Sequence, residues 1–294
     1  MTAPAPNVAD GLTLPTTLVA EAMTPRTHRL ALALAAASCF LMVGCGGGGG
    51  GSAPPVAAAP APASPPPPPP VNAAIAVLMI GNSHTSTNDL PNALAALVRT
   101  GRPGRTVAVT VSPGSMFLEE HLDYAPTTTL LASRRWSFVI LQAQKYSTSG
   151  QIFYPTSQAE EFIRRARGQG AVPVMFPEWP RRDVNETQRI YDLHVYIAQR
   201  EPACVAPIGQ AWDWALARYP TLALHDADGN HSSPAGAYLT ALVLYATLTG
   251  GAPSALPDLP LAGVSAETQG RLRGIASETV AAIAPRTDCP NDPY

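Results

Sequence analysis

A serine and a distant Asp-x-x-His pair are the residues whose types and spacing point to chemistry. Ser83 stands in the Gly-Asn-Ser-His-Thr segment 81–85, directly after an apolar run. Asp228 and His231 are the first and last residues of the Asp-Gly-Asn-His segment 228–231. An aspartate three residues before a histidine can accept its Nδ1 proton, which leaves Nε2 free to take a proton from a serine hydroxyl. A serine needs such a base to attack a carbonyl carbon. The pattern indicates a serine hydrolase, although Ser83 alone could also cap a strand-to-helix turn.

Alternating strand-like and helical segments are expected to position these residues. Apolar runs typical of buried strands occupy residues 73–80, 106–111, 136–141, 171–176 and 204–208. Helical patterns cover 89–98, 157–166, 185–200 and 234–248, and Ser157 with Glu160 forms a capping-box pattern. This alternation predicts a three-layer α/β/α sandwich with a mainly parallel five-stranded sheet, whose ligand site lies beyond the carboxyl ends of the strands.

Over about residues 75–250 the chain resembles the SGNH, or GDSL-type, hydrolase superfamily. That superfamily carries its nucleophile in a Gly-Asp-Ser motif after the first strand and an Asp-x-x-His near the C-terminus. The resemblance implies a flavodoxin-like esterase without a cofactor, with Ser83 as nucleophile, His231 as general base and Asp228 as its orienting partner. Gly114, in a Ser-Pro-Gly-Ser segment after the second strand, matches the glycine whose N–H points at the oxyanion.

Two blocks depart from the superfamily pattern. Asn82 replaces the aspartate of the first block, and the usual Gly-x-Asn-Asp after the third strand is replaced by Leu-Gln-Ala-Gln-Lys at 141–145. Gln142 and Gln144 would project to the same side if the strand continued, and either side-chain amide could donate to an oxyanion. Gln142 is favoured, because branches of the superfamily with glutamine tend to place it directly after the apolar run.

Three other interpretations compete with this one. The α/β-hydrolase elbow is Gly-x-Ser-x-Gly, but Thr85 replaces its second glycine. The residues His225, Asp226, Asp228 and His231 could bind a divalent metal ion, an interpretation that leaves the segment around Ser83 unexplained; no metal is expected. The third alternative is a catalytically inactive domain of the same fold that binds polysaccharide or protein.

Two further residues have open roles. Trp179 follows the fourth strand, where it could stack on a sugar or acyl group or close the core. His121 stands beside two glutamates and is expected to be solvated.

The first 45 residues are predicted to be an N-terminal extension and a lipoprotein signal peptide. Arginines at 26 and 29 precede the apolar run 30–43, and Leu41–Cys45 resembles the bacterial lipobox, in which Cys45 would be lipidated. An ordinary secretory signal is the alternative. We expect a domain anchored by lipid in the bacterial cell envelope, at the outer membrane or periplasmic face, or otherwise secreted.

Residues 46–72 are rich in glycine, alanine and proline and predict a linker, which leaves 73–294 as the hydrolase-like domain. A formal net charge of -2 without a basic run argues against nucleic acid as a partner. The expected substrate is a small-molecule or polysaccharide acyl ester, and the domain is expected to be a monomer. Cys204 and Cys289 could form a disulfide in an oxidising compartment.

Overall fold

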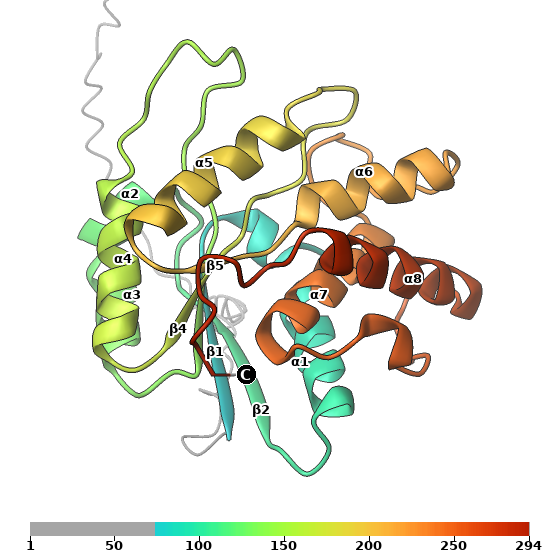
Figure 1. The fold of residues 1–294 in the computed structure, drawn as a ribbon, viewed down its shortest axis with the longest axis horizontal. Coiled ribbons are helices and arrows are strands. Elements are labelled where there is room, and N and C mark those ends of the chain that lie inside the picture. The colour runs from blue at the N-terminus through green and yellow to red at the C-terminus, as the bar shows by residue number, and fades with distance from the viewer. Residues whose placement is uncertain (1–73, 294) are drawn as a thin grey trace, which may run out of the picture. The chain divides into compact units, whose positions relative to one another are not determined.

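Five parallel strands form the centre of the domain in the computed structural model, which describes residues 74–293 (Figure 1). The strands are β1 (Ile75–Ile80), β2 (Val107–Val111), β3 (Phe138–Leu141), β4 (Val172–Met175) and β5 (Cys204–Val205). Their order across the sheet is β2-β1-β3-β4-β5, and every neighbouring pair is parallel. The predicted α/β fold with a parallel five-stranded sheet is therefore confirmed. This order reverses beside β1, which is where an open α/β sheet forms its ligand crevice.

Eight α-helices connect and cover these strands within the described chain. They are α1 (Leu90–Gly101), α2 (Leu118–Asp123), α3 (Ala125–Ala132), α4 (Ser157–Gly168), α5 (Thr187–Arg200), α6 (Ile208–Arg218), α7 (Pro234–Thr249) and α8 (Ala266–Ala282). Short 3₁₀ turns occupy Ser83–Thr85, Thr87–Asp89 and Pro253–Ala255. The capping-box prediction for α4 is wrong, because Thr156 rather than Ser157 is the N-cap and its side chain accepts no capping hydrogen bond; its hydroxyl donates to Glu160 instead.

Alternate residues of each strand face opposite helical layers, as the two-residue period of a strand requires. In β1, Val77 and Met79 pack in the cluster that includes α1, α6, α7 and α8, whereas Leu78 and Ile80 pack in the cluster that includes α4 and α5. Figure 1 shows these two sets of helices on opposite sides of the sheet. Both faces of the sheet are covered, which explains why the strand segments are apolar without interruption.

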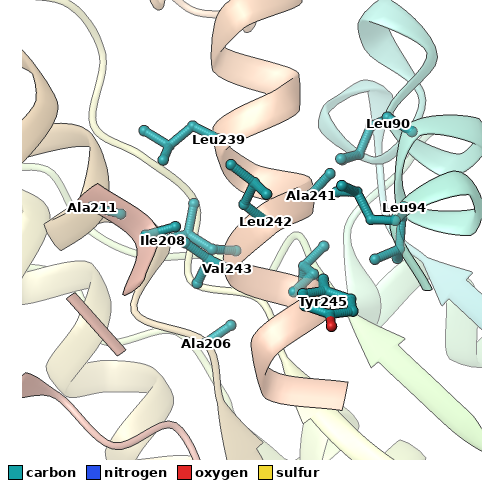
Figure 2. Packing of buried hydrophobic residues seen from close by; sticks show 14 of the residues in the cluster. Leu90, Leu94, Ala206, Ile208, Ala211, Leu239, Ala241, Leu242, Val243 and Tyr245 are labelled. Atoms are coloured by element: carbon teal, nitrogen blue, oxygen red, sulfur yellow. The ribbon is translucent and has the colours of Figure 1, made fainter. Parts of the chain in front are cut away.

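Helix α7 is the most enclosed helix of the described chain. Every residue from Ala235 to Thr249 is buried, and Figure 2 shows Leu242 and Val243 lying between α1 and the segment that leads into α6. The first turn of α7 comes so close to its surroundings that a Cβ on Gly236 would lie 2.2 Å from the carbonyl oxygen of Leu224. Glycine is therefore required where α7 begins, directly after the His231 loop.

A disulfide joins Cys204 of β5 to Cys289 near the C-terminus. The pairing that the sequence left open is thus present, and it closes a loop of 85 residues. Cross-linking residues this far apart lowers the conformational entropy of the unfolded chain and so stabilises the fold. The disulfide fixes the segment that follows α8 to the edge of the sheet.

The predicted signal peptide, Cys45 and the 46–72 linker lie outside the described residues. Within 74–293, none of the helices combines the length and apolar character needed to cross a membrane.

Candidate active site

Ser83 is placed by the tight turn that ends β1. Gly81 follows the strand, and a Cβ on this residue would lie 2.4 Å from Oε1 of Gln142, so no larger residue fits. Asn82 then caps the 3₁₀ turn, because its Oδ1 accepts the backbone N–H of His84 at 3.1 Å. The Thr85 hydroxyl donates back to the Asn82 carbonyl at 2.7 Å. These contacts fix the backbone of Ser83 at the carboxyl end of β1.

The structure brings Ser83, His231 and Asp228 into one line of hydrogen bonds. Ser83 Oγ lies 2.8 Å from His231 Nε2, although 148 residues separate them in sequence. His231 Nδ1 lies 2.5 Å from Asp228 Oδ2. This is the geometry in which the carboxylate sets the imidazole tautomer and Nε2 is free to accept the serine proton. All three predicted residues therefore meet.

The loop that carries Asp228 and His231 is held by its own backbone and by Asp228. The Asp226 N–H donates to the His231 carbonyl at 2.8 Å, and Gly229 turns the chain with a φ of 70°. Asp228 Oδ1 accepts the backbone N–H groups of Asn230 and His231, both at 2.9 Å. Only the second oxygen of Asp228 is left for the imidazole, which fixes the direction of that hydrogen bond.

The Asp228 carboxylate stays ionised at neutral pH. Its hydrogen bond to His231, assisted by the two backbone N–H donors, lowers the pKa of Asp228 well below its usual range. The side chain is 48% exposed, so water shares in this stabilisation. An ionised partner can stabilise the imidazolium that forms when His231 takes a proton.

Two backbone donors are available beside the nucleophile. No other residue of the 74–293 segment accepts a hydrogen bond from the N–H of Ser83 or from that of Gly114. Gly114 follows β2, the strand next to β1, and its φ of 88° is a conformation that favours glycine. Gly114 is not among the residues that line the cavity at Ser83, so its role at the oxyanion stays a prediction.

The two glutamines have other partners. The strand ends at Leu141 and Ala143 has a φ of 69°, so the alternation assumed for Gln142 and Gln144 does not hold. Gln144 donates both amide hydrogens, to the carbonyls of Lys145 at 3.0 Å and Pro155 at 3.1 Å. The structure therefore does not support Gln144 as an oxyanion donor.

Gln142 is fully buried and connects the ends of neighbouring strands. Its Oε1 accepts the Asn82 N–H at 2.9 Å, and its Nε2 donates to Glu178, which follows β4. Gln142 thus holds the residue before the nucleophile. It is not among the side chains that line the cavity at Ser83, so a direct role at the oxyanion stays a prediction.

Glu178 is a functional candidate that the sequence analysis missed. Only 17% of its side chain is exposed, and burial raises its pKa to about 7, while the hydrogen bond from Gln142 acts in the opposite direction. The available signal was its position: it is an acidic residue directly after a buried strand, at the catalytic end of the sheet. At neutral pH this carboxyl group is divided between its two protonation states.

His84 packs against the catalytic histidine. The two imidazole rings stack with centroids 5.1 Å apart, and His84 Nε2 lies 3.2 Å from the carbonyl oxygen of Asn230. Burial lowers the pKa of His84 to about 4, so it is neutral at pH 7. A neutral neighbour does not repel the positive charge that His231 acquires as a base.

Trp179 and His121, whose roles the sequence left open, and the metal-ligand candidate His225 all make structural contacts. Trp179 is 3% exposed and donates to the Asn230 carbonyl at 2.9 Å. Its ring stacks on that of Trp212 with centroids 4.4 Å apart, so it supports the His231 loop from the core. His121 is fully buried rather than solvated, with its Nε2 2.9 Å from the Gly81 carbonyl oxygen. His225 is buried with Nε2 2.9 Å from the Pro180 carbonyl oxygen.

The four residues that could have formed a metal site have other partners. His225 contacts the Pro180 carbonyl, Asp226 Oδ1 accepts the Ala227 N–H, and Asp228 and His231 belong to the line from Ser83. Elsewhere in residues 74–293, Cys204, Cys289 and Asp292 lie close enough together to share an ion, but the two sulfurs are joined as a disulfide. A disulfide sulfur has no thiolate to offer to a metal.

A cavity of about 420 Å³ opens over Ser83 and His231. Its floor comes from the β1 turn, with Asn82, Ser83 and His84. Its walls include Phe117, Lys145, Tyr146, Thr148, Tyr154, Glu178, Arg181, Asn230 and His231. The space suits a small ester or one end of a larger one.

Comparison with known proteins places the fold. No family model and no curated protein matches the chain. A solved DUF4886 family protein from Bacteroides uniformis is 17% identical with a TM-score of 0.57, and the match covers 74% of this chain and 99% of that one. The chain therefore shares its fold with that protein.

Two further solved structures carry names from the superfamily that the sequence resembles. A Slackia heliotrinireducens protein assigned to the SGNH hydrolases is 28% identical (TM-score 0.48; 60% of this chain and 100% of that one). A GDSL-like lipase candidate from Parabacteroides merdae is 13% identical (TM-score 0.46; 62% and 99%). The superfamily assignment of this chain stays a prediction from its motifs.

Glu178→Gln should change how stability depends on pH. In the native state the Glu178 carboxyl binds its proton up to about pH 7, against an ordinary value of 4.5, so the folded wild type holds more protons than the unfolded chain between these values. Its free energy of unfolding therefore falls as pH rises through this window, by about 3 kcal/mol in all. Glutamine still accepts from Gln142 but does not titrate, so the variant lacks this loss.

Urea denaturation at pH 5 and pH 8 measures the effect. Glu267→Gln makes the same charge change at an exposed position of α8 and serves as the control. An equal pH dependence in wild type and Glu178→Gln would contradict the assignment.

Proposed function

We propose that this chain is a serine hydrolase that cleaves carboxylic esters through an acyl-enzyme intermediate. The observation that supports it most is the line from Ser83 Oγ to His231 Nε2 at 2.8 Å and from His231 Nδ1 to Asp228 at 2.5 Å. The line ends in a cavity at the carboxyl end of β1, where sheets of this type carry their ligands.

In the proposed reaction, Ser83 Oγ attacks the ester carbonyl carbon while its proton passes to His231 Nε2. Asp228 holds the imidazole and stabilises its positive charge. His231 then gives the proton to the leaving alcohol oxygen, and the acyl group stays on Ser83. Water, deprotonated by the same histidine, releases the carboxylic acid and restores the serine.

The negative charge on the carbonyl oxygen needs donors in place before the reaction. The free N–H groups of Ser83 and Gly114 fit this role. Gln142 is proposed to assist by holding Asn82 in place, through the hydrogen bond that its Oε1 accepts at 2.9 Å. A loss of the Asn82 contact would displace the Ser83 N–H as well.

The substrate and the location are proposals from the sequence. The lipobox-like segment ending at Cys45 and the proline-rich linker after it would tether the domain to the cell envelope. An acyl ester on envelope or extracellular polysaccharide is then a substrate within reach. The cavity over Ser83 is open enough to receive an acyl group that projects from a larger molecule.

The competing proposal is a domain that binds polysaccharide or protein without turnover. The observation in its favour is that the amide donors of Gln142 and Gln144 are engaged elsewhere, so the usual side-chain donor to the oxyanion is missing from the cavity lining. The two proposals differ in whether Ser83 reacts.

A fluorophosphonate probe should label folded wild-type protein at Ser83, because the histidine activates this hydroxyl alone. Ser83→Ala should lose the label, and hydrolysis of p-nitrophenyl acetate should fall by about 10⁴-fold or more. Ser86→Ala, three residues further in the same turn, is the matched control and should keep the label. Hydrolysis that survives in Ser83→Ala would refute the mechanism, and an intact but unlabelled wild type would favour the binding protein.

Gln142→Ala should reduce kcat/KM for p-nitrophenyl acetate by about 10²- to 10³-fold, because the turn that presents the Ser83 N–H loses its acceptor. Gln144→Ala should reduce it less than tenfold, since the Gln144 amide donates only to the carbonyls of Lys145 and Pro155 and Gln144 does not line the cavity. Thermal melting of both variants separates loss of activity from loss of folding. A larger kinetic effect of Gln144→Ala would reverse the assignment.

Cys45→Ser should abolish lipid attachment in a bacterial expression host. Wild-type chain should incorporate labelled palmitate and fractionate with membranes, whereas the variant should do neither. Cys39→Ser is the control, because Cys39 precedes the small residues at the exit of the apolar run. Equal labelling of wild type and Cys45→Ser would leave the ordinary secretory signal as the correct interpretation.

A further inference from the structure

The wall of the cavity over Ser83 carries a cationic side chain that no described residue engages in a hydrogen bond or ion pair. Arg181 is exposed and lines the cavity, and its guanidinium makes no hydrogen bond or ion pair with any residue between 74 and 293. The segment that carries it follows β4, so it lies at the carboxyl ends of the strands, as Ser83 does. Its charge is therefore available to whatever enters the cavity.

The other cations around the cavity are already bound. Lys145 pairs with Glu119. Arg182 donates to the Asp226 carbonyl at 2.6 Å, and Arg189 donates to the Thr148 carbonyl. Arg181 differs from these neighbours because nothing in the described structure satisfies its five N–H donors.

The acidic residue of the lining, Glu178, offsets the charge of Arg181 only in part, because the two side chains attract each other without forming an ion pair. Glu178 receives its hydrogen bond from Gln142, and no ion pair joins it to Arg181. Burial raises the pKa of Glu178 to about 7, which removes part of its negative charge at neutral pH. The charge that the cavity presents to a ligand is thus positive on the Arg181 side.

We propose that Arg181 binds a carboxylate of the substrate, so that the site acts on acyl esters carrying a negative charge near the scissile bond. This inference rests on the proposed ester hydrolysis at Ser83. A guanidinium matches a carboxylate because its planar fork can donate two parallel hydrogen bonds. The partly exposed rings of Phe117 and Tyr154 line the same cavity and provide flat surfaces for the ring of a carboxylated sugar or arene.

The test compares 4-acetoxybenzoate with methyl 4-acetoxybenzoate, which differ in one negative charge on the leaving group. In both, Ser83 takes the acetyl group, His231 passes the proton to the leaving phenol oxygen, and water then releases acetate. The ratio of kcat/KM for the anionic ester over the neutral one should exceed one in wild type. In Arg181→Gln this ratio should fall about ten- to hundredfold, mainly through KM.

Arg135→Gln is the matched control. It removes the same charge from an exposed position before β3, at the amino ends of the strands, and should leave the ratio at the wild-type value. An unchanged ratio in Arg181→Gln, or an equal fall in Arg135→Gln, would overturn the proposal. A phosphorylated ester, 4-acetoxyphenyl phosphate, forms a further arm: if its ratio depends on Arg181 and that of the carboxylate does not, the anion is a phosphate and the carboxylate assignment is wrong.

Binding to Ser83→Ala separates this inference from the hydrolase itself. Calorimetry should show that Ser83→Ala binds 4-acetoxybenzoate more tightly than its methyl ester, and that adding Arg181→Gln removes the difference. If wild type hydrolyses neither ester but this difference is present, the hydrolase proposal fails and the anion site stands. If hydrolysis occurs and no difference is found, only the anion site fails.

Discussion

The carboxamide of Gln142 joins the ends of three neighbouring strands, and the geometry of the site depends on it. Its oxygen holds the backbone N–H of Asn82 after β1, and its nitrogen holds the Glu178 carboxyl after β4, while the residue itself follows β3. The contact leaves no room for a side chain at Gly81, whose Cβ would lie 2.4 Å from the amide oxygen. Gln142 in this position therefore requires a glycine at position 81.

The proposed catalytic base is supported by buried tryptophan side chains. The loop with His231 rests on Trp179, which donates to the Asn230 carbonyl and stacks on Trp212, and the loop runs into the enclosed helix α7. The imidazole of His84, next to the nucleophile, also packs against Trp179, so the segments that carry Ser83 and His231 contact the same buried ring. A preorganised pair of this kind needs little rearrangement when a substrate binds.

The sequence predicted the strands well because both faces of the sheet are covered, which makes each strand a continuous apolar run. It missed α2, α3 and α8. The first two helices are short, and α8 has few apolar residues, so its periodic pattern is weak although Leu272 and Ile275 pack in the core. The sequence predicted that Ser83, Asp228 and His231 act together, because their motifs can be recognised from the sequence alone. The glutamines could not be placed, because the left-handed backbone at Ala143 redirects Gln144 and no local pattern signals that conformation.

The missed glutamate affects how charge is distributed around the nucleophile. Glu178 lines the cavity and is mostly shielded from water, and an ionised carboxylate there would repel the oxyanion of the proposed reaction. Burial counteracts this repulsion, because it raises the pKa of Glu178 to about 7 and favours the neutral acid. Burial likewise keeps His84 neutral beside His231, with a pKa of about 4. The same physical effect thus acts on two groups of opposite type, and in each case it removes the charge that would oppose the proposed transition state.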